Sequence, residues 1–154
     1  KKIRMKNRIL INKEVYDREI TKEFIRKMVN QILNNLQLEN VEISITLTDN
    51  DTIKSINKQW RGKDKPTDVL SFPQGDTIGY KYRVLGDVVI SLPYAKNQAK
   101  EIGHSYKAEI VRLLTHGILH LLGYDHETNE EDAKIMFDLQ DKICEKVIYE
   151  LQVP

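Results

Sequence analysis

Hydrophobic and polar residues alternate along this chain with two different periods. Residues 41–48 (VEISITLT) switch strictly between apolar and polar side chains, which predicts a β-strand with one buried face and one face that is wet or lines a groove. In residues 21–36 the apolar side chains instead recur every three or four positions, which predicts an amphipathic helix capped by Thr21. Strands and helices are therefore expected in the same chain.

Similar patterns divide the remaining sequence into short elements. We predict three further strands, at 8–13, 68–72 and 84–90, and four further helices, at 50–60, 91–103, 105–122 and 128–151. Thr128 and Glu131 are expected to form a capping box at the start of the last helix. Strands come early and helices late, which indicates an α+β fold with one small mixed β-sheet and helices packed mainly on one side.

The composition is that of a single folded domain. The chain has 154 residues, of which 40% are hydrophobic and 31% charged, so one domain over residues 1–154 is expected to bury a substantial core. No apolar run approaches the roughly 20 residues of a membrane span, and we expect no secretory signal. The single cysteine, Cys144, lies among apolar helix positions and excludes a disulfide framework. A reducing compartment, most simply the cytoplasm, is therefore expected.

Charge is distributed unevenly along the chain. The net charge is +1, but residues 1–107 carry +7 and residues 108–154 carry −6. Such an asymmetry allows an anionic partner to bind one face of the molecule. Solvated helix surfaces explain the same numbers, and from charge alone this explanation is preferred.

Three of the four histidines lie within eleven residues (HGILHLLGYDH): His116, His120 and His126. The first two are four positions apart, so on a helix their side chains share one face. Gly123 is suited to end that helix, and the turn can bring His126 toward the same point. Three neutral imidazoles that leave a fourth position open to water suit one Zn²⁺ ion.

The helix that carries these histidines is apolar on nearly every side and is expected to be buried. Its polar exceptions fall along one side, which is expected to face a polar cleft: Arg112, Thr115, His116 and His120. The spacing resembles the metzincin pattern H-E-x-x-H-x-x-G-x-x-H, which predicts a zincin-like metal helix. Gly117 stands where that pattern has the glutamate that acts as general base. A peptidase is therefore disfavoured.

A second group of charged residues lies in residues 59–73 (QWRGKDKPTDVLSFP). The cations Arg61, Lys63 and Lys65 flank the single anion Asp64. An arginine is suited to two-pronged contact with a phosphate group. Taken alone, the segment is better explained as an exposed loop with solvated charges.

Together with LGDVVI at residues 85–90, these two segments resemble the YbeY family of bacterial endoribonucleases, which are linked to ribosomal RNA maturation and ribosome quality control. The resemblance covers about residues 57–126. It implies a zinc-binding site at His116, His120 and His126 and a functionally important arginine at Arg61.

The resemblance also implies the substrate. The expected reaction is cleavage of a phosphodiester in single-stranded RNA, with RNA of the small ribosomal subunit as the partner and with no DNA or membrane partner. Arg61 would stabilise charge on the reacting phosphate. Lys63 and Lys65 would bind the RNA backbone, together with basic residues among positions 1–8.

Several roles are left open by the sequence. No residue is identified as general base, Asp87 and Asp125 are candidates to orient the histidines, and His104 is expected to be a surface or capping residue. Two other functions remain: a different zinc-dependent hydrolase, such as a peptidase, or a non-catalytic ribosome-assembly factor with a structural zinc. A structural site usually has a fourth protein ligand, for which the histidine segment offers only Asp125.

Overall fold

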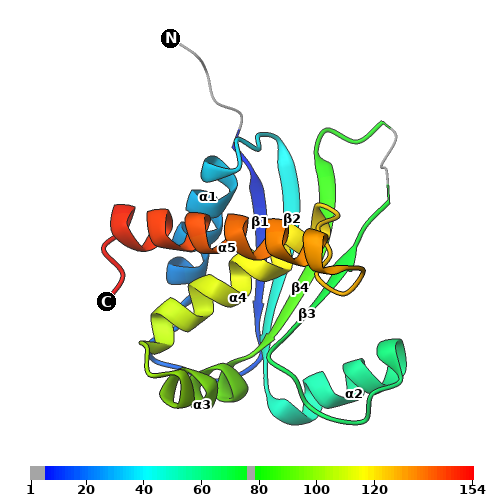
Figure 1. Ribbon diagram of the computed structural model, residues 1–154, viewed down its shortest axis with the longest axis vertical. Helices are drawn as coiled ribbons and strands as arrows, with labels where there is room; N and C mark the ends of the chain where they lie inside the picture. Colours follow the sequence, from blue (N-terminus) through cyan, green and yellow to red (C-terminus); the bar gives the residue numbers. More distant parts are fainter. Residues whose placement is uncertain (1–5, 76–78) are drawn as a thin grey trace.

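The computed structural model describes residues 6–75 and 79–154 and contains one β-sheet and five helices (Figure 1). The elements follow the expected order, and each begins and ends within two residues of its expected bounds: β1 (Arg8–Lys13), α1 (Lys22–Asn35), β2 (Val41–Thr48), α2 (Asn50–Arg61), β3 (Val69–Pro73), β4 (Arg83–Ser91), α3 (Leu92–Ile102), α4 (Tyr106–Leu121) and α5 (Glu130–Glu150). Most of the basic N-terminal positions proposed to bind RNA, residues 1–5, lie outside the described part of the chain.

The sheet is mixed, as the element order predicts. Its strand order is β1-β2-β4-β3, with β1, β2 and β4 parallel and β3 antiparallel to β4. The pairing of β3 with β4 places Leu70 opposite Val89 and Ser71 opposite Val88. Strand β3 is therefore an edge strand, with one side of its backbone free of the sheet.

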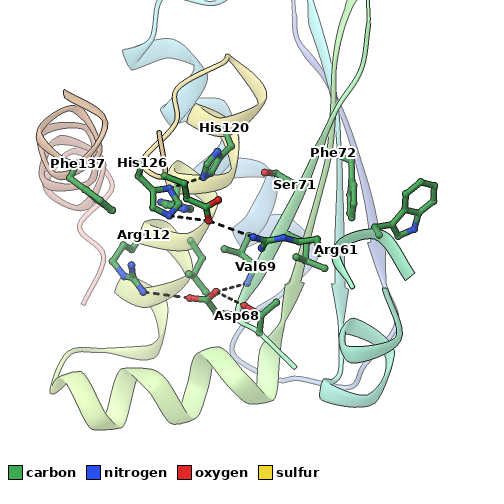
Figure 2. A pocket seen from close by; sticks show the side chains of 15 residues that line it. Arg61, Asp68, Val69, Ser71, Phe72, Arg112, His120, His126 and Phe137 are labelled. Carbon is green, nitrogen blue, oxygen red and sulfur yellow. Dashed lines mark hydrogen bonds and ion pairs between the residues drawn. The ribbon is translucent and has the colours of Figure 1, made fainter. Parts of the chain in front are cut away.

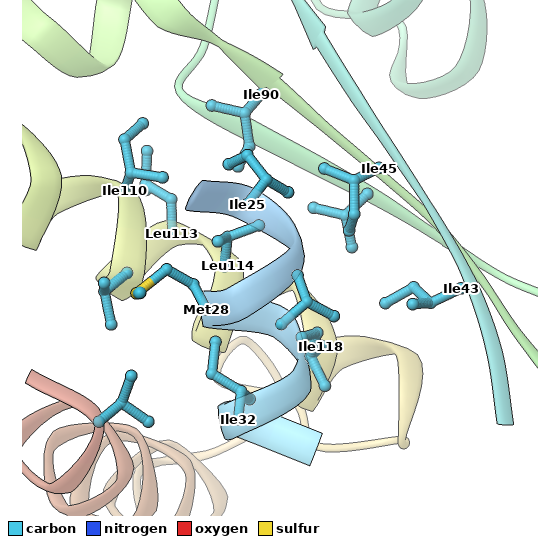
Figure 3. Packing of buried hydrophobic residues seen from close by; sticks show 14 of the residues in the cluster. Ile25, Met28, Ile32, Ile43, Ile45, Ile90, Ile110, Leu113, Leu114 and Ile118 are labelled. Carbon is cyan, nitrogen blue, oxygen red and sulfur yellow. The ribbon is translucent and has the colours of Figure 1, made fainter. Parts of the chain in front are cut away.

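Helices cover the two faces of the sheet unequally. The helices α1, α4 and α5 lie together on one face, whereas α2 stands apart beside the other (Figure 1). The larger core lies under the first group and joins strand residues such as Ile43 and Ile45 to Ile25 of α1 and Ile118 of α4 (Figure 3). Burial in β2 alternates between buried and intermediate positions along most of the strand, which confirms the half-buried strand expected from its sequence.

Helix termini confirm most of the expected caps and correct one. The side chain of Thr21 accepts a hydrogen bond from the backbone N–H of Phe24, 3.0 Å away. At α5 the N-cap is Asn129, whose side-chain oxygen accepts from the backbone N–H of Asp132 at 2.7 Å. The expected Thr128–Glu131 capping box is therefore wrong by one residue, because asparagine caps a helix as well as threonine does.

The structure also bears on the environment of the single cysteine and on membrane-spanning segments. Cys144 is buried in the main core, as expected, and burial raises the pKa of its thiol to about 11. Within the described residues, the helices are all too short or too polar to cross a membrane.

Candidate active site

Helix α4 carries the polar side chains of the candidate site. Its N-cap is Ser105, whose hydroxyl accepts from the backbone N–H of Ala108, and it is followed by Gly123 in the left-handed conformation (φ +99°). Arg112, His116 and His120 line an open cleft of about 600 Å³. Thr115 does not: it is fully buried and its hydroxyl donates to a backbone oxygen one turn earlier. The expected polar stripe is therefore correct except at Thr115.

The turn after Gly123 brings the third histidine back to the other two. Ring nitrogens of His116, His120 and His126 all lie within 4.8 Å of one another, and Nε2 of His120 is 3.2 Å from Nδ1 of His126 (Figure 2). Such a set of nitrogen donors can hold one metal ion. Burial, followed by repulsion from His126, lowers the pKa of His120. Neutral imidazole, the form that binds a metal, is thereby favoured.

Gln140 is a part of this site that sequence reasoning missed. Its side-chain oxygen lies 2.7 Å from Nδ1 of His116, and the residue is only 2% exposed on α5. Because this oxygen accepts, Nδ1 carries the proton and Nε2 keeps its lone pair. The available signal was a polar residue within the apolar face that includes Met136 and Ile143.

Asp87 and Asp125, the two candidates to orient the histidines, do not form hydrogen bonds to them. Asp87 is exposed on β4, on the face opposite to its neighbour Val88, which packs toward α4. Asp125 shapes the turn, because its carboxylate accepts from the backbone N–H of Glu127 at 2.8 Å. That hydrogen bond lowers the pKa of the Asp125 carboxyl.

Gly117 lacks the carboxylate of the metzincin pattern, and it also has a role in packing. A Cβ atom built at this position would lie 2.8 Å from Cγ1 of Val88 on β4. Val88 is fully buried, so it has little room to move. The glycine therefore allows α4 to lie directly against the sheet, and a glutamate would not fit here.

Arg61 reaches into the cleft from the end of α2. Gly62, in the left-handed conformation, caps that helix. The guanidinium points across the cleft toward the histidine side and lies 3.5 Å from the carboxylate of Glu127 (Figure 2). Glu127 also lies 3.9 Å from His126 and was not anticipated from the sequence. Arg61 therefore lies where it can act on a phosphate held near the histidines.

The first charged residues that follow Arg61 in the sequence do not reach into the cleft. Asp64 pairs with Lys58 at 3.9 Å rather than with Arg61. Lys63 and Lys65 are exposed and are not among the residues that line the cleft. A role for these two lysines in binding RNA stays a prediction, and it would lie outside the cleft.

A buried carboxylate anchors a second cation at the cleft wall. Glu109 is completely buried and accepts two hydrogen bonds from Arg112, at 2.8 and 2.6 Å, and further ones from Gln98 and His104. Asp68 joins the same group by accepting from Gln98 at 3.0 Å. Burial alone would raise the pKa of Glu109, but the hydrogen bonds from Arg112 and Gln98 outweigh it and the pKa is lowered.

His104 is therefore neither a simple surface residue nor a cap. Gly103 ends α3 in the left-handed conformation, which turns the chain so that His104 lies beside the first turn of α4. Its Nε2 is 2.7 Å from the carboxylate of Glu109. This contact could not be predicted from the sequence pattern, because His104 lies in a loop and its partner is buried on α4.

Comparison with known proteins agrees with this geometry. The family model described as "Endoribonuclease YbeY" matches residues 9–148. A relative from Sulfurihydrogenibium sp. (strain YO3AOP1) named "Endoribonuclease YbeY" is 74% identical over 146 residues, which cover 95% of this chain and 96% of the relative. A relative of the same name from Aquifex aeolicus (strain VF5) is 47% identical and covers 94% of each chain.

A solved structure supports the same fold. The solution structure of a protein from Thermotoga maritima is similar with a TM-score of 0.66 and 31% sequence identity, and the match covers 94% of this chain and 91% of that one. Family model, relatives and fold therefore agree over nearly the whole length. This chain belongs to the endoribonuclease YbeY family.

Proposed function

We propose that this protein is a zinc-dependent endoribonuclease that cleaves single-stranded RNA, with ribosomal RNA of the small subunit as its substrate. The observation that carries the proposal is the convergence of His116, His120, His126 and Arg61 on one open cleft. The names of the relatives support the endoribonuclease activity.

The histidines would hold the ion. Zinc favours nitrogen ligands, and a site with three protein ligands keeps a coordination position open for chemistry. When bound, the ion supplies Lewis-acid stabilisation of the charge on a phosphoryl oxygen. Gln140 keeps the His116 ring oriented, and the lowered pKa values of His116 and His120, caused first by burial, keep these rings neutral and available.

Arg61 would bind the phosphate that is cleaved. Its planar guanidinium can contact two phosphate oxygens at once. The contact with Glu127 is long, at 3.5 Å, and both side chains are well exposed. An exposed pair of this kind contributes little free energy, so the phosphate can replace Glu127 as the partner of Arg61 at low cost.

The two alternatives are disfavoured by specific features. A peptidase of the zincin kind needs a general base at position 117, where this chain has a glycine whose Cβ would lie 2.8 Å from Cγ1 of Val88. A structural zinc usually has four protein ligands, whereas the cluster found within the described residues consists of three histidines beside an open cleft.

The test is cleavage of defined RNAs by the zinc-loaded protein. We expect cleavage of a single-stranded oligoribonucleotide, protection when its complement is annealed, and loss of activity in Arg61→Ala and His120→Ala. Lys54→Ala, an exposed position on the same helix as Arg61, is the matched control. Equal cleavage by wild type and Arg61→Ala would contradict the assignment. Faster cleavage of small-subunit ribosomal RNA than of an unrelated RNA of equal length tests the substrate.

A further inference from the structure

An exposed indole lies at the rim of the cleft, directly beside Arg61 in the sequence. Trp60 is the only tryptophan of the chain and is 67% exposed. Its ring meets the ring of Phe72 edge to face, with centroids 6.0 Å apart and planes at 62°. Both rings line the same cleft as Arg61 and the histidines. We refer to Trp60 and Phe72 as the aromatic platform.

The platform is fixed from below. Phe72 packs against a small buried cluster on the α2 side of the sheet, formed by Ile53, Leu70 and Val89. The indole is thereby held along one edge, while most of its surface faces solvent. Leaving a large aromatic ring exposed forgoes the burial free energy that such rings normally contribute. An exposed ring that contacts Phe72 beside a candidate active site suggests a ligand that covers it.

We propose that the indole of Trp60 stacks on an unpaired base of single-stranded RNA whose neighbouring phosphate lies in the cleft. The inference rests on the proposed function and deepens it by naming a base-binding subsite. Cations are close to Trp60 along the chain: Arg61 follows it directly, and Lys58 and Lys63 lie within three residues of it. Aromatic rings interleaved with cations bind the bases and phosphates of single strands together.

The arrangement around β3 connects the phosphate and base positions. Arg61 points toward the histidines, whereas Phe72 lies on the other side of β3 (Figure 2). An RNA strand held by Arg61 therefore passes over the edge of β3 to reach the platform. The backbone oxygen of Asp68 and the backbone N–H of Gln74 bond toward β4, so the alternating pattern turns the backbone groups of Ser71 to the free edge. The RNA strand would therefore pass polar backbone groups at the edge of β3.

This placement accounts for a preference for single strands. Bases in an RNA duplex are paired and stacked on their neighbours, so none offers a free face to the indole. An unpaired base does, whatever its identity, because every base has an aromatic face. The platform is expected to select unpaired nucleotides and not a base sequence.

Because Trp60 is the only tryptophan, its fluorescence reports on the platform directly. The zinc-loaded protein is mixed in a stopped-flow instrument with a single-stranded oligoribonucleotide, its duplex, or an abasic oligomer of the same length, and is read before products appear. We expect quenching by the single strand only. Unchanged fluorescence with all three probes, or equal quenching by the abasic oligomer, would overturn the proposal.

Variants separate stacking from charge. Binding of a dye-labelled oligomer is measured by anisotropy, and Trp60→Ala is expected to bind the single strand about tenfold more weakly while its affinity for the abasic oligomer is unchanged. Trp60→Tyr should restore most of the loss. Tyr149→Ala removes a more exposed ring far along α5, at a residue 84% exposed, and should change neither affinity. Equal losses of Trp60→Ala for both oligomers would contradict stacking.

The outcome is distinguishable from failure of the proposed function. RNA cleavage without any response of Trp60 would overturn the platform and leave the nuclease assignment intact. Base-dependent quenching without cleavage by the zinc-loaded protein would overturn the nuclease assignment and leave the platform as a base-binding site.

Discussion

The side-chain oxygen of Gln140 lies 2.7 Å from Nδ1 of His116 and ties α5 to the candidate metal centre. The contact is partly buried, joins residues 24 positions apart, and fixes which nitrogen of the imidazole faces the other histidines. Helix α5 therefore does more than cover the core, because it sets the orientation of one of the proposed ligands.

Replacing Gln140 should weaken metal binding. In Gln140→Ala the His116 ring loses its orienting partner, and zinc affinity is expected to fall about 10- to 100-fold. Competition with a chromophoric zinc chelator measures this without any nuclease assay. Lys142→Ala, exposed on the same helix, should match wild type. If Gln140→Ala retains wild-type zinc affinity, the carboxamide has no role in orienting the ligand.

The buried carboxylate of Glu109 should make stability depend on acid pH. The pKa of Glu109 in the folded protein lies below the ordinary value of 4.5. At pH values between the folded pKa and 4.5, the unfolded chain therefore binds more protons than the folded protein does, and the free energy of unfolding rises with pH. The contribution is complete at neutral pH and is lost as the pH falls below about 4.5 and through the folded pKa. The charged groups that face the carboxylate are Arg112 and, when protonated, His104.

Glu109→Gln tests this contribution. A carboxamide cannot accept all the hydrogen bonds from Arg112, Gln98 and His104, so we expect a loss of about 3 kcal/mol at pH 7, because one partner of a buried ion pair is neutralised. Denaturant unfolding from pH 7 down to pH 3 should show the difference from wild type shrinking. Glu101→Gln, exposed on α3, serves as control. A difference that stays constant with pH would show that the carboxylate charge is not the cause.

Sequence patterns were sufficient where the determining interactions are local. The alternation in β2 and the spacing of His116 and His120 follow from the periods of a strand and a helix, so both could be predicted. Tertiary contacts could not, because Gln140 reaches His116 from another helix and Glu109 collects partners from two helices and a loop. The N-cap of α5 was misplaced because residues 128 and 129 both have side chains suited to capping.

Removing the metal should lower stability by mass action. With free zinc at about 100 times its dissociation constant, a site present only in the folded state adds about 2.7 kcal/mol. Chelation should therefore lower the melting temperature of the wild type by several degrees and leave His120→Ala unchanged. His104→Ala removes the histidine outside the cluster and should keep the chelator-dependent shift. Identical shifts in wild type and His120→Ala would place the metal elsewhere.

Arg61 should matter for its geometry as well as for its charge. Arg61→Ala is expected to change stability by less than about 0.5 kcal/mol, because the residue is exposed at a helix end, but to slow RNA cleavage about 100-fold or more. Arg61→Lys should recover only part of the rate, since an ammonium group lacks the planar fork. Measured zinc content should be equal in all three proteins. Full recovery by lysine would show that charge alone is required.

The contact between Gly117 and Val88 predicts a coupling between α4 and β4. Alanine is the better helix former by about 1 kcal/mol, yet its Cβ would lie 2.8 Å from a fully buried valine. Overpacking of this kind costs about 1–3 kcal/mol, so Gly117→Ala should destabilise the protein or at best be neutral. Val88→Ala alone should also destabilise by leaving a cavity. The double variant should lose less than the two single losses combined, because the smaller residue at 88 accommodates the new methyl group, and unfolding free energies of all four proteins measure this. Strict additivity would show that the helix moves away from the sheet instead, and that Gly117 is not required for the close approach.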